Sequence, residues 1–293
     1  MTIKKALFVG NTYLDITLDT IAIPLGDNKL RDQKYAVNLG GNATVAGCTV
    51  SRLGSKVEIV TPMANDDLNV LIQELYKKED ITLHAIQASK TSLSVIIPNG
   101  IQRAIILCGD KDVDNKTPTI DLSKFKIIHF DGHMPEITLE LAKQAKQFGI
   151  LTSLDGGTVR TGTQELLKYI DIAVVSEQFC DDLELSHKDT LEYLAKQGCK
   201  VSAITRGIRG VIGLEDGEFF KIPAMSEIKV KDSTGAGDIF HGAYVSNYLK
   251  NESESFKSHF EYANIVAGLA VQRLGTVSSI PSLEEIEKQE TIN

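Results

Sequence analysis

The stretch Asp232-Ser-Thr-Gly-Ala-Gly-Asp238 places a small-residue turn between two carboxylates, and a helical pattern, Ile239–Leu249, follows it directly. At such a helix mouth the amides of Gly235-Ala236-Gly237 could approach an anion closely, because unsatisfied N–H groups and the helix dipole favour negative charge. Asp238 would stand beside that anion, where a carboxylate can take a proton from an attacking hydroxyl. The pattern fits phosphoryl transfer; the plainer interpretation is that Asp238 only charge-matches the helix start.

Two further clusters could contact a ligand. Thr205-Arg-Gly207-Ile-Arg-Gly210 follows an apolar run and offers a hydroxyl, a guanidinium and flexible backbone to phosphate oxygens, with a plain turn as the alternative. Gly40-Gly41-Asn42 precedes a helical pattern, so its glycines permit close backbone approach and Asn42 can both donate to and accept from a hydroxylated ligand. Helix capping is the alternative there. Asp15, in a loop after the first apolar run, could accept two hydrogen bonds from sugar hydroxyls.

Other ligand motifs are absent or incomplete. The motif G-x-x-x-x-G-K-[ST] does not occur, and Gly235, Gly237 and Gly242 are spaced wrongly for G-x-G-x-x-G, which argues against a Rossmann dehydrogenase. The run His129-Phe-Asp131-Gly-His133 lacks a third ligand at a defined spacing, which argues against a metal centre.

Asp155 and Arg160 lie at and just after the end of another apolar run, Leu151–Asp155. Ligand sites of α/β folds form at the carboxyl ends of parallel strands. The two residues are therefore candidate contacts to a charged group of a substrate, or partners in a structural ion pair.

Composition excludes several classes of function. The 293 residues carry 31 Lys plus Arg against 39 Asp plus Glu, a net charge of −8, and no basic run, so we expect no nucleic-acid partner. The most apolar stretch, Asn264–Val271, is far shorter than the roughly 18 residues that span a bilayer, and no signal peptide is visible. The four cysteines are scattered without metal-ligand spacing. These features predict reduced thiols, no membrane partner and a cytoplasmic location.

Apolar runs bounded by Gly or Pro alternate with helical patterns along the chain. The runs that predict buried strands are Lys5–Gly10, Val57–Thr61, Ile127–Asp131, Leu151–Asp155, Ile172–Ser176 and Val201–Thr205. The patterns that predict helices are Ala43–Leu53, Glu136–Phe148 and Asp189–Gln197, each followed by the glycine that a helix C-terminus favours. Such alternation forms βαβ units, so we expect an α/β fold with a mostly parallel central sheet flanked by helices.

One part of the chain departs from this alternation. Ser92–Cys108 consists of two β-type runs around Asn99-Gly100, a pair that suits a type I′ hairpin turn. The segment 12–36 also lacks helical periodicity and could pair with this hairpin as a small separate sheet, which we interpret as a lid. An antiparallel edge on the main sheet is the alternative. The predicted division is a nucleotide- and substrate-binding core of residues 1–11, 37–87 and 109–293, and a β lid of residues 12–36 and 88–108.

Three of these motifs, in this order and spacing, resemble those of the ribokinase-like (PfkB) carbohydrate kinases: Gly40-Gly41-Asn42, Thr205-x-Gly207-x-x-Gly210 and Asp232-Ser-Thr-Gly-Ala-Gly-Asp238. The resemblance covers essentially the whole chain, and the last motif is close to the family's D-T-x-G-A-G-D. It implies a ribokinase-like fold and an ATP-dependent kinase that transfers the γ-phosphoryl of Mg-ATP to a sugar hydroxyl. The segments around Asp155 and Glu177 look closer to the ketohexokinase and sulfosugar kinase branch.

The resemblance also implies a role for each motif. Asp238 corresponds to the family's catalytic base, and its anion hole corresponds to Gly235, Ala236 and Gly237. Sugar-binding positions correspond to Asp15, Gly40, Gly41 and Asn42. ATP-binding positions correspond to Thr205, Gly207, Gly210 and Asn264. The monovalent cation of ribokinases, such as K⁺, would be held by Asp232, Thr234, Ala270, Arg273, Gly275 and Ser279.

Two departures from the family pattern concern the metal and the sugar. Where the family has N-x-x-E, which organises Mg²⁺ and phosphates, the chain has Ser176-Glu177-Gln178-Phe179. Either Glu177 substitutes by a shift, or water and nucleotide alone hold Mg²⁺. Where the family often has a second Asn, Val45 removes a polar contact to the sugar.

Two other functions and one partner remain open at this stage. A nucleoside kinase of the same fold and a non-catalytic sugar or nucleotide sensor are the alternative functions. The lid of family members often forms a dimer interface, so the apolar Leu93–Leu107 hairpin could carry a homodimer; packing of these residues in the core is the alternative.

Overall fold

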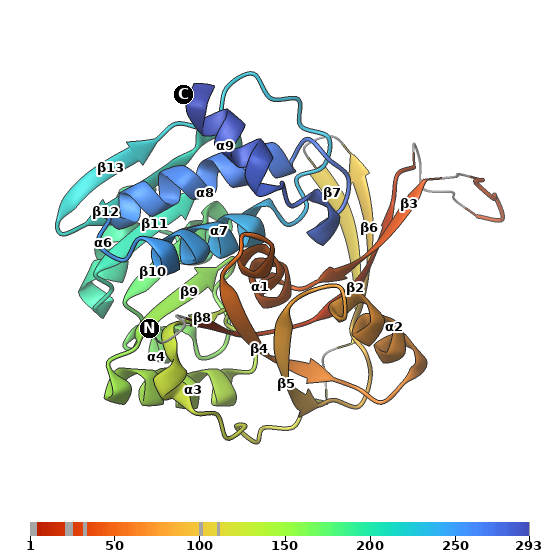
Figure 1. The fold of residues 1–293 in the computed structure, drawn as a ribbon, viewed down its shortest axis with the longest axis horizontal. Coiled ribbons are helices and arrows are strands. Elements are labelled where there is room, and N and C mark those ends of the chain that lie inside the picture. The colour runs from red at the N-terminus through yellow and green to blue at the C-terminus, as the bar shows by residue number, and fades with distance from the viewer. Residues whose placement is uncertain (1–4, 21–25, 32–33, 100–101, 110–111, 293) are drawn as a thin grey trace.

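The computed structural model describes residues 5–20, 26–31, 34–99, 102–109 and 112–292 (Figure 1). Within them, a nine-stranded sheet runs in the order β13-β12-β11-β10-β9-β8-β1-β4-β5. The seven strands from β11 to β5 in that order pair in parallel, and β12 and β13 add an antiparallel edge. The strands are β1 (Lys5–Val9), β4 (Lys56–Met63), β5 (Ile81–Gln87), β8 (Phe125–Phe130), β9 (Leu151–Gly156), β10 (Ile172–Ser176), β11 (Val201–Thr205), β12 (Val211–Glu215) and β13 (Glu218–Ile222).

This sheet confirms the predicted α/β fold with a mostly parallel centre. Each of the six predicted strands is present, because apolar runs such as that of β1 are buried on both faces of the sheet. The strands β5, β12 and β13 were not predicted. Most positions of β5 and β13 are exposed or only partly buried, so these strands lack the continuous apolar run of a central strand.

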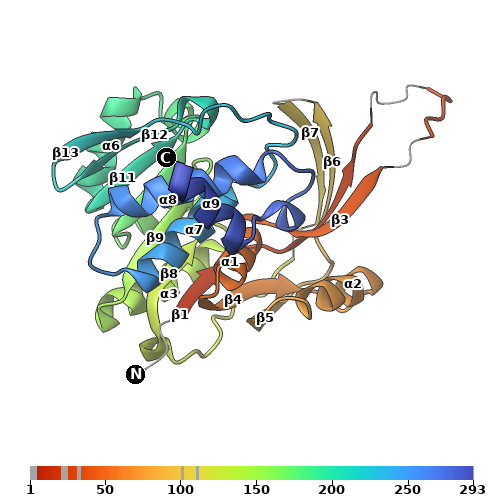
Figure 2. The ribbon, with the colours of Figure 1, turned by 45° about the horizontal axis from the view of Figure 1, so that its top comes forward.

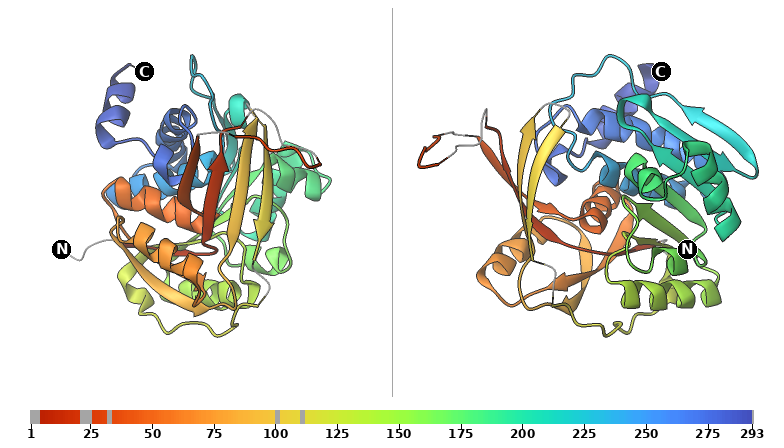
Figure 3. Two further views of the ribbon diagram at one scale, coloured as in Figure 1. Left: turned by 90° about the vertical axis from the view of Figure 1, so that its right-hand side faces the viewer. Right: turned by 180° about the vertical axis from the view of Figure 1, so that it is seen from behind.

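Helices cover both faces of the sheet, and each face has its own buried apolar cluster (Figures 1 and 3). One cluster is formed with α1 (Asn42–Arg52), α2 (Asp67–Tyr76), α7 (Ala236–Lys250), α8 (Phe256–Ala270) and α9 (Leu283–Ile292). The other is formed with α3 (Pro135–Phe148), α4 (Thr163–Leu167), α5 (Glu177–Asp182) and α6 (His187–Gln197). The 3₁₀ turns of the described residues are η1 (Leu122–Lys124), η2 (Gly207–Arg209) and η3 (Val277–Ser279). Among the described helices, none is long and apolar enough to cross a membrane.

A second, four-stranded sheet stands beside the main sheet (Figure 2). It consists of β2 (Tyr13–Leu18), β3 (Tyr35–Gly40), β6 (Leu93–Asn99) and β7 (Gln102–Cys108) in the order β3-β2-β6-β7. The predicted segments therefore form a sheet of their own and not an edge of the main sheet. Two details differ from the predictions: Asn99 pairs with Gln102 as a strand residue, and β3 crosses the predicted lid boundary at residue 36. Gly100, the other residue of the predicted turn, lies outside the described residues.

Helices α1 and α7 pack side by side and run in the same direction. A Cβ atom at Gly242 of α7 would overlap the carbonyl oxygen of Ala46 in α1, so the two backbones touch at this glycine. Further along, Lys250 Nζ donates to the carbonyl oxygen of Leu53 at 2.6 Å. Since equivalent turns face each other, the N-terminal ends of α1 and α7 meet at the same edge of the sheet.

Candidate active site

The predicted anion hole lies at an open helix N-terminus. Gly235 is the N-cap of α7 with a left-handed φ of 75°, and the helix begins at Ala236. The Ala236 amide donates to the Ser233 carbonyl at 3.3 Å, whereas Gly237 is exposed, and a Cβ placed there would meet no atom within 4 Å. The first N–H groups of a helix have no intrahelical acceptor, so this end of α7 can accept an anion. Asp238 is half-buried in the first turn.

Asp232 fixes the loop that leads into this helix. Its Oδ1 accepts the Thr234 amide and its Oδ2 accepts the Gly275 amide, both at 2.9 Å. The Lys231 and Asp232 amides donate to the Val271 carbonyl at 2.8 and 3.1 Å. The carboxylate thereby ties the loop before α7 to the segment after α8.

The residues predicted to hold a monovalent cation have different side-chain environments. Arg273 forms an ion pair with Glu285, and Ser279 Oγ donates to the Thr276 carbonyl at 2.7 Å. Ala270 is buried in the last turn of α8. Of the set, Asp232 and the buried Thr234 hydroxyl are the side-chain oxygens that suit a small cation. The Thr234 hydroxyl has no hydrogen-bond partner within the described part of the chain.

The paired glycines lie next to the mouth of α7. The Thr276 hydroxyl donates to the Leu39 carbonyl at 2.9 Å, and a Cβ at Gly235 would sit 3.3 Å from the Thr276 side chain. The Ser278 amide donates to Asn38 Oδ1 at 3.1 Å. The segment that ends at Gly40-Gly41 and the segment that opens α7 are therefore neighbours.

Asp15 is a buried residue of strand β2 and not a loop residue as predicted. It faces Ser94 of β6, whose hydroxyl donates to its carboxylate, and it packs against Gly40, where a Cβ would overlap the carboxyl group. Burial raises the pKa of Asp15 to about 6, although hydrogen bonds from Ser94 and Thr276 counteract the rise. The small sheet thus supplies a carboxyl group with a pKa of about 6.

Asn42 begins α1, and its side chain is already held in place. Its Nδ2 donates to Asp155 Oδ2 at 2.8 Å, and Asp155 Oδ1 lies 3.4 Å from His241 Nε2. His241 is one turn beyond Asp238 on α7. The sequence analysis identified Asn42 and Asp155 as separate candidates. It did not predict that they share a hydrogen bond or that His241 lies beside Asp155.

Two buried histidines, His129 and His241, lie next to each other beneath this site. The His129 and His241 rings lie 5.0 Å apart, and His129 Nδ1 is 2.9 Å from Ser153 Oγ. Burial lowers the pKa of His241, opposed by Asp155, and burial together with His241 lowers the pKa of His129 well below its ordinary value. Both rings are thus neutral near pH 7. Among the described residues, no three His, Cys, Asp or Glu side chains could hold a metal ion.

The predicted nucleotide-binding residues surround the end of β11. Thr205 Oγ1 is 3.4 Å from the Val175 carbonyl, and Gly210 packs against Ile222, where a Cβ would overlap the carbonyl oxygen. Asn264 on α8 donates to the Pro223 carbonyl at 3.0 Å. These contacts bring η2, the segment after β13 and α8 together.

Glu177, the residue considered as a substitute for the missing N-x-x-E glutamate, is already paired. It forms an ion pair with Arg209 of η2, and His187 Nε2 lies 3.1 Å from its Oε1. Ser176 accepts the Phe179 amide as the N-cap of α5. The structure therefore gives this segment a role in holding the 207–210 turn.

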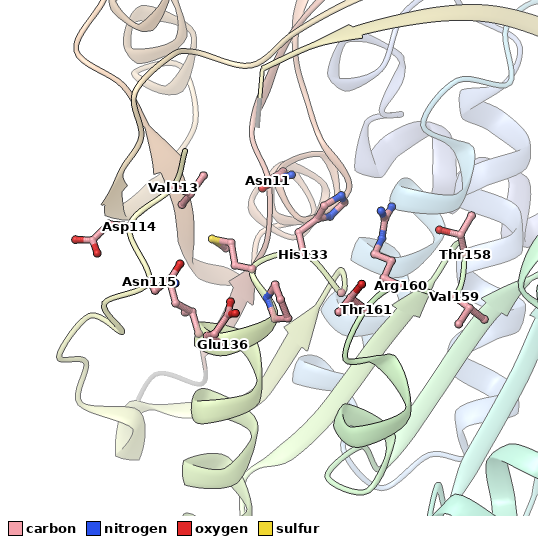
Figure 4. A pocket seen from close by; sticks show the side chains of 14 residues that line it. Asn11, Val113, Asp114, Asn115, His133, Glu136, Thr158, Val159, Arg160 and Thr161 are labelled. Atoms are coloured by element: carbon pink, nitrogen blue, oxygen red, sulfur yellow. The ribbon is translucent and has the colours of Figure 1, made fainter. Parts of the chain in front are cut away.

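A pocket of about 570 Å³ adjoins the site at the carboxyl ends of β1, β8 and β9 (Figure 4). Its lining includes Asn11, His133, Thr158 and Arg160. Asn11 connects it to the paired glycines, because a Cβ at Gly41 would overlap the Asn11 carbonyl oxygen.

Two helix N-termini meet at the carboxyl edge of a parallel sheet, and one of them carries a carboxylate in its first turn. This arrangement fits an α/β phosphotransferase. Residues 4–283 match the family described as pfkB family carbohydrate kinase. The chain is 27% identical over 305 residues to the ribokinase of Staphylococcus aureus (strain COL), covering 97% of this chain and 99% of that protein. The chain belongs to the pfkB family of carbohydrate kinases. It is an ATP-dependent phosphotransferase that acts on a carbohydrate.

Solved structures agree with this assignment. The ribokinase of Thermotoga maritima superposes with a TM-score of 0.82 at 26% identity, with 99% of both chains covered. An Escherichia coli protein described as a ribokinase II, in complex with ATP and Mg²⁺, has the same fold at 20% identity, with a TM-score of 0.81, covering 99% of this chain and 100% of that one.

Proposed function

We propose that this enzyme transfers the γ-phosphoryl group of Mg-ATP to a sugar hydroxyl, with Asp238 as the general base. The observation that carries the proposal is the parallel packing of α1 and α7 at Gly242, which brings the Asn42 and Asp238 ends of the two helices to one edge of the sheet. A base, an anion-binding helix end and an acceptor-binding residue are the parts that this reaction requires.

The helix mouth at Gly235, Ala236 and Gly237 neutralises negative charge on the transferred phosphoryl. Phosphoryl transfer depends mainly on in-line positioning and on stabilisation of charge spread over the phosphoryl oxygens. Preorganised donors are effective because they need no reorientation during reaction; loss of one such donor in oxyanion holes costs about 3–4 kcal/mol. Asp238 then has to accept only the proton of the attacking hydroxyl.

Asp15, Gly40, Gly41 and Asn42 bind the sugar acceptor. Asp15 comes from the small sheet and Asn42 from the core, so a sugar between them contacts both parts of the molecule. The link from Asn42 through Asp155 to His241 fixes the amide, so that less side-chain entropy is lost when the sugar binds. The small sheet acts as a lid that excludes water and so prevents ATP hydrolysis.

Thr205, Gly207, Gly210 and Asn264 hold the nucleotide, and Mg²⁺ supplies neutralisation of the phosphate charge when it is bound. The open space around Gly207, where a Cβ would meet nothing within 4 Å, fits close approach of a phosphate to the backbone. Because Glu177 is paired with Arg209, nucleotide and water supply most of the Mg²⁺ ligands. Asp232 and Thr234 provide the side-chain oxygens of a K⁺ site beside the helix mouth.

The substitution Asp238→Asn tests the role of the base. The variant is expected to fold and to bind ATP as the wild type does, and to lose at least about 100-fold in kcat, as removal of a general base does. Asp189→Asn, at an exposed helix first turn on the opposite face, is the matched control and should keep full turnover. Full activity of Asp238→Asn in an ADP-release assay would refute the role.

The same assay separates the alternatives. Release of ADP with nucleosides and not with sugars would favour a nucleoside kinase, and tight binding of ATP and sugar without a phosphorylated product would favour a sensor.

A homodimer through the lid and a cytoplasmic location complete the proposal. Ile105, Ile106 and Leu107 of β7 are exposed, with Leu107 63% accessible, which suits a second copy on this sheet. Light scattering, which measures the molecular mass in solution, tests whether the protein is a dimer. The four cysteines are free thiols, as a reducing compartment favours.

A further inference from the structure

The pocket at the carboxyl ends of β1, β8 and β9 extends beyond the residues that the proposed function uses. It has a volume of about 570 Å³, and side chains from the segments that follow all three strands line it (Figure 4). A Cβ at Gly157 would lie 3.8 Å from Asp155 Oδ1 and 4.0 Å from Asn42 Nδ2. Thr158, the neighbour of Gly157, and Asn11, which packs against Gly41, both line the pocket, so the pocket lies beside the acceptor site.

Arg160 lines this pocket, and its guanidinium has no partner among the residues that the structure describes. The sequence left open whether Arg160 pairs with Asp155, and the structure answers this: Asp155 is hydrogen-bonded to Asn42 and lies beside His241. Across the described residues, no ion pair or side-chain hydrogen bond of Arg160 occurs, although its backbone amide donates to Thr163 Oγ1 at 2.9 Å. Its stem passes close to Gly132, where a Cβ would lie 3.5 Å from Arg160 Cδ. A planar guanidinium with five free donors suits a carboxylate, phosphate or sulfonate.

His133 lies beside Arg160 and is held by a buried carboxylate. Its Nδ1 lies 3.1 Å from Asp131 Oδ1, and the hydrogen bonds to this carboxylate come from the backbone amides of His133 and Asn11, at 3.0 and 2.9 Å. Asp131 is buried, and its carboxylate accepts hydrogen bonds from these amides, so its negative charge is not exposed to the pocket. Figure 4 shows the His133 and Arg160 side chains directed into the same space.

The acidic side chains of the pocket stand apart from this pair. Asp114 and Glu136 line the opposite end, away from Arg160 and toward Asn115 (Figure 4). The pocket is therefore polarised, with its cationic end near Asn11 and Thr158, on the side of the acceptor site.

We infer that the acceptor of this kinase carries an anionic substituent, a phosphate, sulfonate or carboxylate, which binds between Arg160 and His133. The inference rests on the proposed function, because it takes the sugar to lie at Asn42 with its reacting hydroxyl toward Asp238. A neutral ribose or fructose leaves the guanidinium without a partner, whereas an acidic sugar fills the pocket and neutralises the charge.

Matched pairs of acceptors test this. Each neutral sugar is compared with its phosphate, sulfonate and carboxylate derivative in an ADP-release assay at constant ionic strength. We expect kcat/KM to be at least about 10-fold higher for an anionic member than for its neutral partner, as a charge-assisted contact provides. The derivative with the highest kcat/KM identifies the group.

Variants of the arginine separate this contact from a structural effect. Arg160→Gln is expected to lower kcat/KM for the anionic acceptor by about 10- to 100-fold, mainly through KM, and to leave neutral acceptors and the KM for ATP within about twofold. Arg160→Lys keeps the charge without the planar fork and should fall between the two. Lys168→Gln, which removes an exposed cation outside the pocket, is the matched control.

Each result decides one question. Equal use of neutral and anionic sugars, or equal losses on both in Arg160→Gln, would overturn the inference while the kinase assignment stands. If no acceptor is phosphorylated, the proposed function fails, and thermal denaturation with inorganic phosphate and with sulfate tests the pocket itself. Stabilisation that is lost in Arg160→Gln and kept in Lys168→Gln supports the anion site, and stabilisation that is absent or equal in all three proteins refutes it.

Discussion

Asp15→Asn should stabilise the fold while it weakens the acceptor site. The carboxyl group is buried in β2, and burial raises its pKa from 3.8 to about 6. A pKa that is higher in the folded state means that folding disfavours the ionised carboxylate. The folded state therefore loses stability as the pH rises from 3.8 to about 6, and this loss stays constant at higher pH. At about 1.4 kcal/mol per pKa unit, the penalty is roughly 3 kcal/mol at pH 8 and roughly half of that at pH 5.

The asparagine has nearly the same shape and no charge to desolvate. It can still accept the hydrogen bond from Ser94, so the variant relieves the penalty without opening a cavity. Urea denaturation at pH 5 and pH 8 measures the free energy of unfolding of both proteins. We expect the gain of Asp15→Asn over wild type to grow by roughly 1–1.5 kcal/mol between these two pH values. The KM for the acceptor should rise in the variant, and the KM for ATP should not change.

Asp19→Asn provides the control, because Asp19 follows the same strand but its side chain is 38% exposed. Asp19→Asn should change the free energy of unfolding by no more than about 0.5 kcal/mol, as exposed substitutions usually do. A loss of stability in Asp15→Asn that is equal at pH 5 and pH 8 would refute the reasoning, since the carboxyl group would then be ionised in the folded state without penalty.

Two further substitutions probe how the site is held together. Gly242→Ala places a methyl group against the Ala46 carbonyl, so it should lower the free energy of unfolding by about 1–3 kcal/mol and reduce turnover, whereas Gly237→Ala, with open space at its Cβ, should leave thermal stability unchanged. Asp232→Asn replaces one acceptor oxygen by an NH₂ group that faces the amide of Thr234 or Gly275, so about 1–3 kcal/mol of stability and any activation by K⁺ should be lost together; activation that persists would place the cation elsewhere.

The sequence predicted those parts of the molecule that local patterns determine. Continuous apolar runs located the six buried strands, and glycine-ended helical patterns located α1, α3 and α6. The antiparallel β12–β13 edge was not predicted, because half-exposed edge strands have weaker patterns. Asp15 was placed in a loop, since pairing of β2 with β3 and β6 depends on residues far along the chain.

Side-chain partners across long sequence separations explain the rest. Asn42 and Asp155 are 113 residues apart, and nothing near either residue indicates that they share a hydrogen bond. The same holds for Asp232 and Gly275, and for the pairing of Glu177 with Arg209. Sequence motifs indicate which residues are candidates for catalysis or binding. The hydrogen-bond and ion-pair partners of these residues are visible only in the folded structure.

The geometry of the site is set by the core and not by its loops. Helices α1 and α7 can touch at Gly242 only because that position has no side chain, and this contact determines how far Asn42 lies from Asp238. His241, on the same helix as Asp238, lies beside the carboxylate that holds Asn42. A shift of α7 would therefore displace the base and the acceptor-binding amide together. Packed helices hold reactive groups in more precise positions than flexible loops do. Phosphoryl transfer requires this precision because the reacting atoms must be aligned in line.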